Sequence, residues 1–129
     1  MNKIIVEVSV GELLDKISIL EIKKEIIKDP EKLKFISNEY SILKDQLEKN
    51  VKSGDKLNKL FQDLKEINAK LWVIEDDKRH CEKNKDFGDK FVKLSRDVHF
   101  LNDDRAKIKL EINNHTGSSI KEIKEYTSY

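Results

Sequence analysis

The chain has 129 residues, of which 37% are hydrophobic and 40% are charged, and it contains four glycines and one proline. This length fits a single domain, and the shortage of turn residues favours long helices with solvated faces over a sheet. Basic and acidic residues number 26 and 25 and also balance within each part of the chain, so no basic face for nucleic acid is expected.

The single cysteine, Cys81, excludes an intramolecular disulfide and is typical of a reducing compartment. No stretch approaches the roughly 18 consecutive apolar residues of a membrane span. Residues 1–10 alternate apolar and polar side chains and lack the apolar block of a signal peptide. We therefore expect a cytoplasmic protein that binds neither membrane nor nucleic acid.

Residues 1–8 are predicted to form an extended arm. Ile5, Val6, Val8 and Val10 are β-branched and surround Glu7, a pattern typical of a short strand. The sequence offers this strand no partner. The arm is therefore expected either to lie along the helices or to pair with its copy in another subunit.

The first helix is predicted to begin after Ser9, because Ser9 and Glu12 have the spacing of a capping box. Its apolar residues fall on more than one side, with one stripe of Leu13, Ile17, Leu20 and Ile27 and further positions at Leu14, Ile19, Ile22 and Ile26. Such a helix is expected to be enclosed by neighbours or by a second subunit, so we expect a homo-oligomer.

Three further helices are predicted from apolar spacing. Asp29 and Pro30 end one helix and begin the next, whose heptad pattern covers residues 33–47. A break at residues 53–55 precedes a second heptad pattern over residues 57–74, and these two helices are expected to pack as an antiparallel pair. The last long helix covers residues 87–113, and Gly117 is its expected terminator.

Ser119 and Glu122 are spaced to cap one more short helical turn near the C-terminus. The predicted fold is therefore all-α, an antiparallel four-helix bundle with a short N-terminal extended segment and a short C-terminal helical turn. The single domain, residues 1–129, divides into an arm at 1–8, the bundle at 9–113 and a tail at 114–129.

Arg105 interrupts the apolar stripe of the last helix, between Leu101 and Ile108. Arginine is rare here, since the chain has 23 lysines and three arginines, Arg79, Arg96 and Arg105. A guanidinium is planar and can form paired hydrogen bonds with a carboxylate or phosphate. A buried guanidinium needs an acceptor, for which an up-and-down bundle offers Asp15, and a ligand anion is the alternative.

Helical projection places further polar residues on or beside the predicted buried faces, with Glu75 at the centre of its face. Together with Arg105 they predict a pocket for a small anionic or phosphorylated molecule with an aromatic or sugar part. Its predicted lining is Asp15, Tyr40, Asn68, Trp72, Glu75, Arg79, Asn102 and Arg105. If the pocket performs chemistry, Glu75 or Asp15 is the candidate catalytic base and Trp72 a stacking wall.

Two other interpretations stay open. Polar residues inside heptad helices more commonly fix the helix register, which would make this a structural or adaptor module for protein–protein interaction. A set of acidic residues also resembles, loosely, the magnesium ligands of all-helical nucleoside triphosphate pyrophosphohydrolases; these are Glu12, Asp15, Glu21 and Glu25 with Glu75 and Asp76. Those enzymes carry paired motifs of this kind, of which the chain has only Glu12-x-x-Asp15. No cofactor is expected, and magnesium enters only with this third interpretation.

A zinc site is not predicted. His80 and Cys81 are adjacent and point in different directions on a helix, and His99 would add one further ligand.

The segment that runs from Val8 to Ile17 and continues at residues 20–23 resembles the opening of an uncharacterised bacterial and phage family, catalogued as a domain of unknown function. Residues 68–79, 96–113 and 117–129 are similar to later segments of the same family. The resemblance implies no activity. The segments that resemble the family contain the polar residues that helical projection places on or beside the predicted buried faces.

Overall fold

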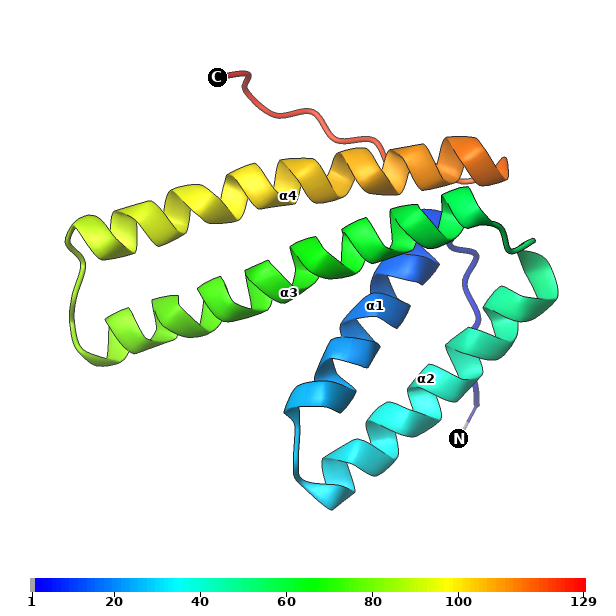
Figure 1. Ribbon diagram of the computed structural model, residues 1–129, viewed down its shortest axis with the longest axis horizontal. Helices are drawn as coiled ribbons and strands as arrows, with labels where there is room; N and C mark the ends of the chain where they lie inside the picture. The colour runs from blue at the N-terminus through cyan, green and yellow to red at the C-terminus, as the bar shows by residue number, and fades with distance from the viewer. Residues whose placement is uncertain (1) are drawn as a thin grey trace.

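The structure is a computed structural model that describes residues 2–129 (Figure 1). Its four helices are α1 (Val10–Ile26), α2 (Pro30–Asn50), α3 (Asp55–Lys83) and α4 (Asp89–Thr116). Residues 2–129 contain no strand, so the predicted all-α class is confirmed.

The helix ends follow the predicted capping residues. The Ser9 hydroxyl accepts a hydrogen bond from the Glu12 amide at 3.0 Å, and the Asp29 carboxylate accepts one from the Glu31 amide at 3.1 Å. Gly117 ends α4 in the left-handed conformation, with φ of 69°. Glycine adopts this conformation without the steric cost that a Cβ atom brings.

The helices form two hairpins that cross each other. Figure 1 shows α3 and α4 side by side and antiparallel, while α1 and α2 leave from the half that holds the start of α3 and the end of α4. Within residues 2–129, α1 packs against all three other helices, whereas α2 lies along α1 and is not packed along α3 or α4. The predicted enclosure of the first helix is confirmed.

The expected antiparallel pairing of the second and third helices is wrong. The apolar stripe of α2 faces α1, and the buried leucines of α3 face α1 and α4. Only the end of α2 reaches the central cluster, through Leu47 and Val51. A heptad stripe specifies a face for packing but does not specify which neighbour covers it.

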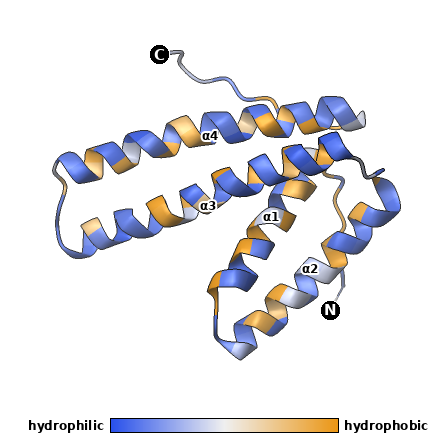
Figure 2. Ribbon diagram, in the orientation of Figure 1, coloured by the Kyte–Doolittle hydropathy of each residue, from blue (hydrophilic) through white to orange (hydrophobic). Residues whose placement is uncertain are grey.

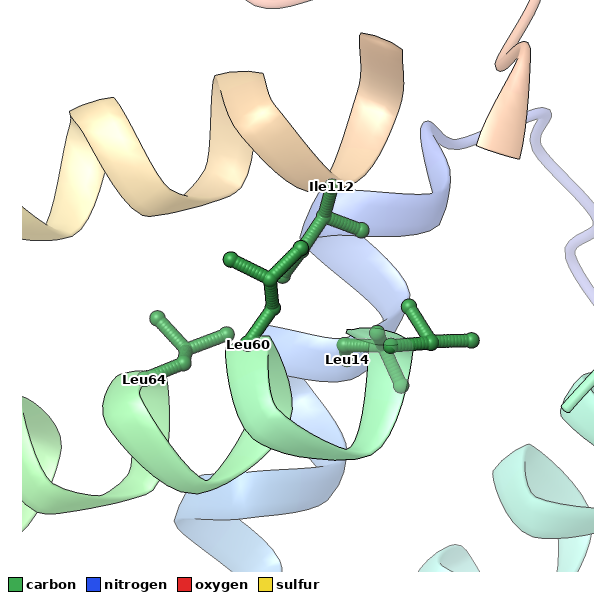
Figure 3. Close-up of a cluster of buried hydrophobic side chains, with 5 residues drawn as sticks. Leu14, Leu60, Leu64 and Ile112 are labelled. Atoms are coloured by element: carbon green, nitrogen blue, oxygen red, sulfur yellow. The ribbon is translucent and has the colours of Figure 1, made fainter. Parts of the chain in front are cut away.

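The core lies where α1 meets the α3–α4 hairpin. Leu14 from α1, Leu60 and Leu64 from α3, and Ile112 from α4 converge in Figure 3, and Leu57 completes the cluster. Each of these side chains is at most 6% exposed. Full burial of a leucine or isoleucine contributes about 1.5–3 kcal/mol, so this cluster anchors the crossing of the hairpins.

The far half of the α3–α4 hairpin extends beyond α1 (Figure 1). There Val73 is 57% exposed and Val92 51% exposed, and Glu75 and Arg79 are exposed as well. The prediction that Glu75 lies at the centre of a buried face is therefore wrong. Figure 2 shows hydrophobic and hydrophilic positions alternating along this half, as on the rest of the hairpin.

The predicted helical turn in the tail is not formed, because residues 118–129 contain no helix. The residues that would cap it have other partners: the Ser119 hydroxyl donates to Glu7 at 2.9 Å, and the Glu122 carboxylate accepts from Lys109 at 3.0 Å. The tail instead follows α4 (Figure 1), where the Tyr129 ring packs against His99 and Phe100.

No helix among residues 2–129 combines the length and the apolar character needed to cross a bilayer.

Candidate functional site

Three helices are joined by a network of polar side chains centred on Asn68, which is 4% exposed. The Asn68 amide nitrogen donates to the Asp15 carboxylate and to the Ser18 hydroxyl, each at 2.8 Å. Its carbonyl oxygen accepts from Nη1 of Arg105 at 3.0 Å, and Nη2 of Arg105 donates to Asn102 at 2.6 Å. The network links α1, α3 and α4.

The acceptors of Arg105 are therefore two side-chain amides. Among residues 2–129 the guanidinium makes no ion pair, so the expected direct pairing with Asp15 is wrong, although Asn68 connects the two groups. The side chain of Arg105 is half-buried rather than sealed, and it lines a groove open to solvent. Two amide hydrogen bonds hold the guanidinium in one orientation.

Lys109, one turn after Arg105, is the buried cation of this region, at 9% exposed. Its ammonium donates to Glu12 at 2.8 Å and to Glu122 at 3.0 Å, and it lies 3.9 Å from Asp15. Burial lowers the pKa of Lys109, but the hydrogen bonds to Glu12 and Glu122 outweigh burial and the net pKa is raised. The lysine therefore stays charged and ties α1, α4 and the tail together.

A groove of about 410 Å³ opens beside Asn68 and Arg105. One wall comes from α1 and the others come from α3 and α4. The lining residues are Ile19, Asn68, Leu71, Trp72, Glu75, Asp76, Arg79 and Arg105. Five of the eight predicted pocket residues are thus brought to one groove, while Asp15 and Asn102 lie behind it and hold Asn68 and Arg105 from the other side.

The two arginines of the groove differ in how they are held. Arg105 is oriented by two amides, whereas Arg79 is 76% exposed at its side chain and faces Glu75 at 3.7 Å one turn away. An exposed pair of this kind contributes only about 0.3–0.5 kcal/mol. Arg79 can therefore leave Glu75 at little cost.

Tyr40 lies outside the groove. Its hydroxyl donates to Glu21 at 3.3 Å, beside a Lys65 ammonium that also contacts Glu25 at 2.8 Å. Partial burial raises the pKa of Tyr40, and the Glu21 carboxylate adds to that effect. Tyr40 therefore belongs to a contact of α1 with α2, which the predicted pocket did not anticipate.

Sequence reasoning missed Lys109 and Ser18, both of which lie on buried faces. The signal was available for Lys109, since it stands four residues after Arg105 and three before Ile112, the spacing of one helical face. Ser18 follows the fully buried Ile17 and is satisfied by donating to the Asp15 carbonyl at 2.8 Å.

Metal-binding geometry is absent from residues 2–129, where no group of three His, Cys, Asp or Glu side chains converges. His80 faces Asp76 at 3.4 Å on the surface, and Cys81 is buried. The carboxylates of Glu12 and Asp15 surround an ammonium rather than an open cation position.

Fold and groove together define a small all-α protein in which a polar network supports an arginine- and tryptophan-lined groove. The chain matches the model of a family of unknown function, DUF6165, over residues 4–129, and it therefore belongs to that family. No curated protein and no solved structure matches the chain. The bacterial and phage distribution stays an expectation of the sequence resemblance.

Proposed function

We propose that this protein binds a small anionic or phosphorylated molecule, with an aromatic or sugar part, in the groove between α1, α3 and α4. The observation that carries the proposal is that Arg79 and Arg105, two of the three arginines in the chain, line one groove from different helices. Guanidinium groups bind phosphate and carboxylate through paired hydrogen bonds. The volume of about 410 Å³ suits a ligand of metabolite size.

The two arginines would bind the ligand anion in different ways. Arg105 is pre-oriented by Asn68 and Asn102, so a ligand anion would meet it with little loss of side-chain entropy. Arg79 would swing from Glu75 to close on the anion from the open side. A ligand that enters from solvent could therefore bind first to the oriented Arg105 and then be closed in by the mobile Arg79.

The remaining lining residues favour a ligand with more than an anionic group. Trp72 is half-buried and lines the groove together with the apolar residues Ile19 and Leu71, and an indole ring can stack on a base or a sugar. Glu75 and Asp76 add two acceptors, which suit the hydroxyl groups of a sugar or an amino group. A bare inorganic anion would leave these groups unused.

Trp72 is the single tryptophan of the chain, so its fluorescence reports directly on the groove. Phosphorylated sugars and nucleotides are titrated while Trp72 emission and the unfolding temperature are followed. We expect a subset to change both. Arg79→Ala should weaken this response, whereas Arg96→Ala should not, because Arg96 lies over the Phe100 ring and does not line the groove.

A screen in which no phosphorylated compound alters wild-type emission or melting would refute the proposal. If Arg79→Ala and Arg96→Ala weakened the change in Trp72 emission and unfolding temperature equally, general positive charge, and not the groove, would attract the ligand.

A structural or adaptor role is the second candidate, and it is favoured by how completely the Asn68 side chain is satisfied. A network that serves only helix register can be replaced by apolar residues of similar volume. We then expect the double variant Asp15→Asn, Arg105→Met to lose no more stability than the about 1–3 kcal/mol that Asn68 and Asn102 forfeit with their donor. A large loss of folding in that variant would oppose a pure register role.

Any catalysis would centre on Glu75, since Asp15 lies behind the groove. A magnesium-dependent pyrophosphohydrolase activity is tested by incubation with nucleoside triphosphates and magnesium, where absence of pyrophosphate release ends that alternative. We propose a cytoplasmic location on the grounds of the lone, unpaired Cys81.

A further inference from the structure

The N-terminal arm exposes its apolar side chains to an unusual degree. Ile4, Ile5 and Val6 are 92%, 88% and 69% exposed, and exposure falls to 4% at Ser9, where the arm joins α1. The arm therefore does not lie along the helices, which was one of its two expected fates. Among residues 2–8 a single hydrogen bond, from Ser119 to Glu7 at 2.9 Å, connects the arm to the tail, close to where the arm joins α1.

An extended segment with free backbone groups and β-branched side chains is a template for strand pairing. Residues 2–129 provide no strand to pair with it. We propose that two copies of this chain pair through their arms as an antiparallel two-stranded ribbon, with Ile5 of each copy on the two-fold axis. The arm is thus a self-association element separate from the groove.

Charge fixes the register of this ribbon. With Ile5 opposite Ile5, Lys3 of each chain faces Glu7 of the other, and the same face carries both ion pairs around the central isoleucines. On the opposite face Ile4 meets Val6. A shift of one residue in either direction sets Lys3 or Glu7 against an apolar side chain, so the register centred on Ile5 is the complementary one.

Pairing would alter little of the folded domain. Glu7 exchanges an exposed bond from Ser119 for an ion pair with Lys3 of the second copy. Ser9 keeps its buried capping bond to Glu12, so the root of each arm stays anchored to α1. A two-stranded ribbon is only marginally stable alone, and covalent trapping is therefore the suitable test.

Opposite residues in an antiparallel pair have Cα atoms about 4.5–5.5 Å apart, within the range of about 4.4–6.8 Å that a disulfide spans. Under mild oxidation Ile5→Cys should give a disulfide-linked dimer. Ile4→Cys is the matched control, because residue 4 is the more exposed, at 92%, yet its two copies lie two residues apart along the ribbon. Wild type controls for Cys81, which is 3% exposed.

Lys3→Glu, added to the Ile5→Cys chain, should slow crosslinking by about fivefold or more, since both ion pairs become repulsive. Further addition of Glu7→Lys restores the pairs in reverse and should restore the rate. Equal crosslinking of the Ile4→Cys and Ile5→Cys chains would overturn the proposal, because random collision explains it. If the crosslinking rate of the Ile5→Cys chain did not change with the charges at residues 3 and 7, the proposed register would be wrong.

Discussion

Gly11 lies so close to Lys109 that a Cβ atom at residue 11 would stand 2.7 Å from the Lys109 carbonyl oxygen. Oδ1 of Asn113 would be 3.0 Å away, and this oxygen accepts a hydrogen bond from the Gly11 amide at 2.7 Å. The first turn of α1 is therefore held against the last turns of α4 by a direct approach of backbone to backbone. Only glycine permits that approach without displacement.

We expect Gly11→Ala to lower the free energy of unfolding by about 1–3 kcal/mol, because the backbones of α1 and α4 must move apart. The higher helix propensity of alanine offsets less than about 1 kcal/mol of this. Urea denaturation measures the difference. Gly54→Ala is the control, since a Cβ atom there meets nothing within 4 Å, and its stability should match or slightly exceed wild type.

Asn68→Leu should destabilise the fold by about 2–4 kcal/mol, since Asp15, Ser18 and Arg105 each lose a hydrogen bond at a buried or half-buried position. Asn58→Leu, an exposed position on the same helix, should change stability by no more than about 0.5 kcal/mol. Urea unfolding of both variants decides the matter. Equal stability of the two would mean that the polar network contributes nothing.

The helix ends could be predicted from the sequence because capping is local. Ser9, Asp29 and Gly117 act within one turn of their own position, so their residue types suffice to locate the ends of α1, α2 and α4. The link between Asp15, Asn68 and Arg105 was also accessible, since short connections align the heights of neighbouring helices.

The crossing of the two hairpins could not be predicted. Periodicity assigns Glu75 and Arg79 to the same face as Leu64 and Leu71, but it does not show that this face becomes exposed beyond Leu71. The same limit explains the misplacement of Tyr40, whose helix packs on α1 instead of α3. Both errors concern the choice of partner for a face, which is a tertiary property.

Acid should release the tail. The hydrogen bond from Lys109 lowers the pKa of Glu122 from its ordinary value of 4.5, so its stabilising contribution is fully present above 4.5 and is lost as pH falls through the depressed value. The pair also persists toward alkaline pH, because the pKa of Lys109 is raised above 10.5. The half-exposed carboxylate limits the contribution to about 1 kcal/mol or less.

Backbone 15N relaxation of residues 118–129, measured across this pH range, detects the release as a gain in mobility on the picosecond to nanosecond timescale. Glu122→Gln should show a mobile tail already at neutral pH, whereas Glu125→Gln should behave as wild type. Identical relaxation of Glu122→Gln and wild type at neutral pH would mean that the Lys109 contact does not dock the tail.

Arg79 and Arg105 should separate binding from stability. Arg79→Ala removes a side chain that is 76% exposed and that pairs, within residues 2–129, with Glu75 alone, so the free energy of unfolding should change by less than about 1 kcal/mol while ligand affinity falls. Arg105→Ala should lower both, because Asn68 and Asn102 lose their donor at a cost of about 1–3 kcal/mol. Urea unfolding and Trp72 titration, performed on the same preparations, measure the two quantities independently. If Arg79→Ala proved as destabilising as Arg105→Ala, both arginines would serve the stability of the fold. The proposed difference between an oriented Arg105 and a mobile Arg79 would then be wrong.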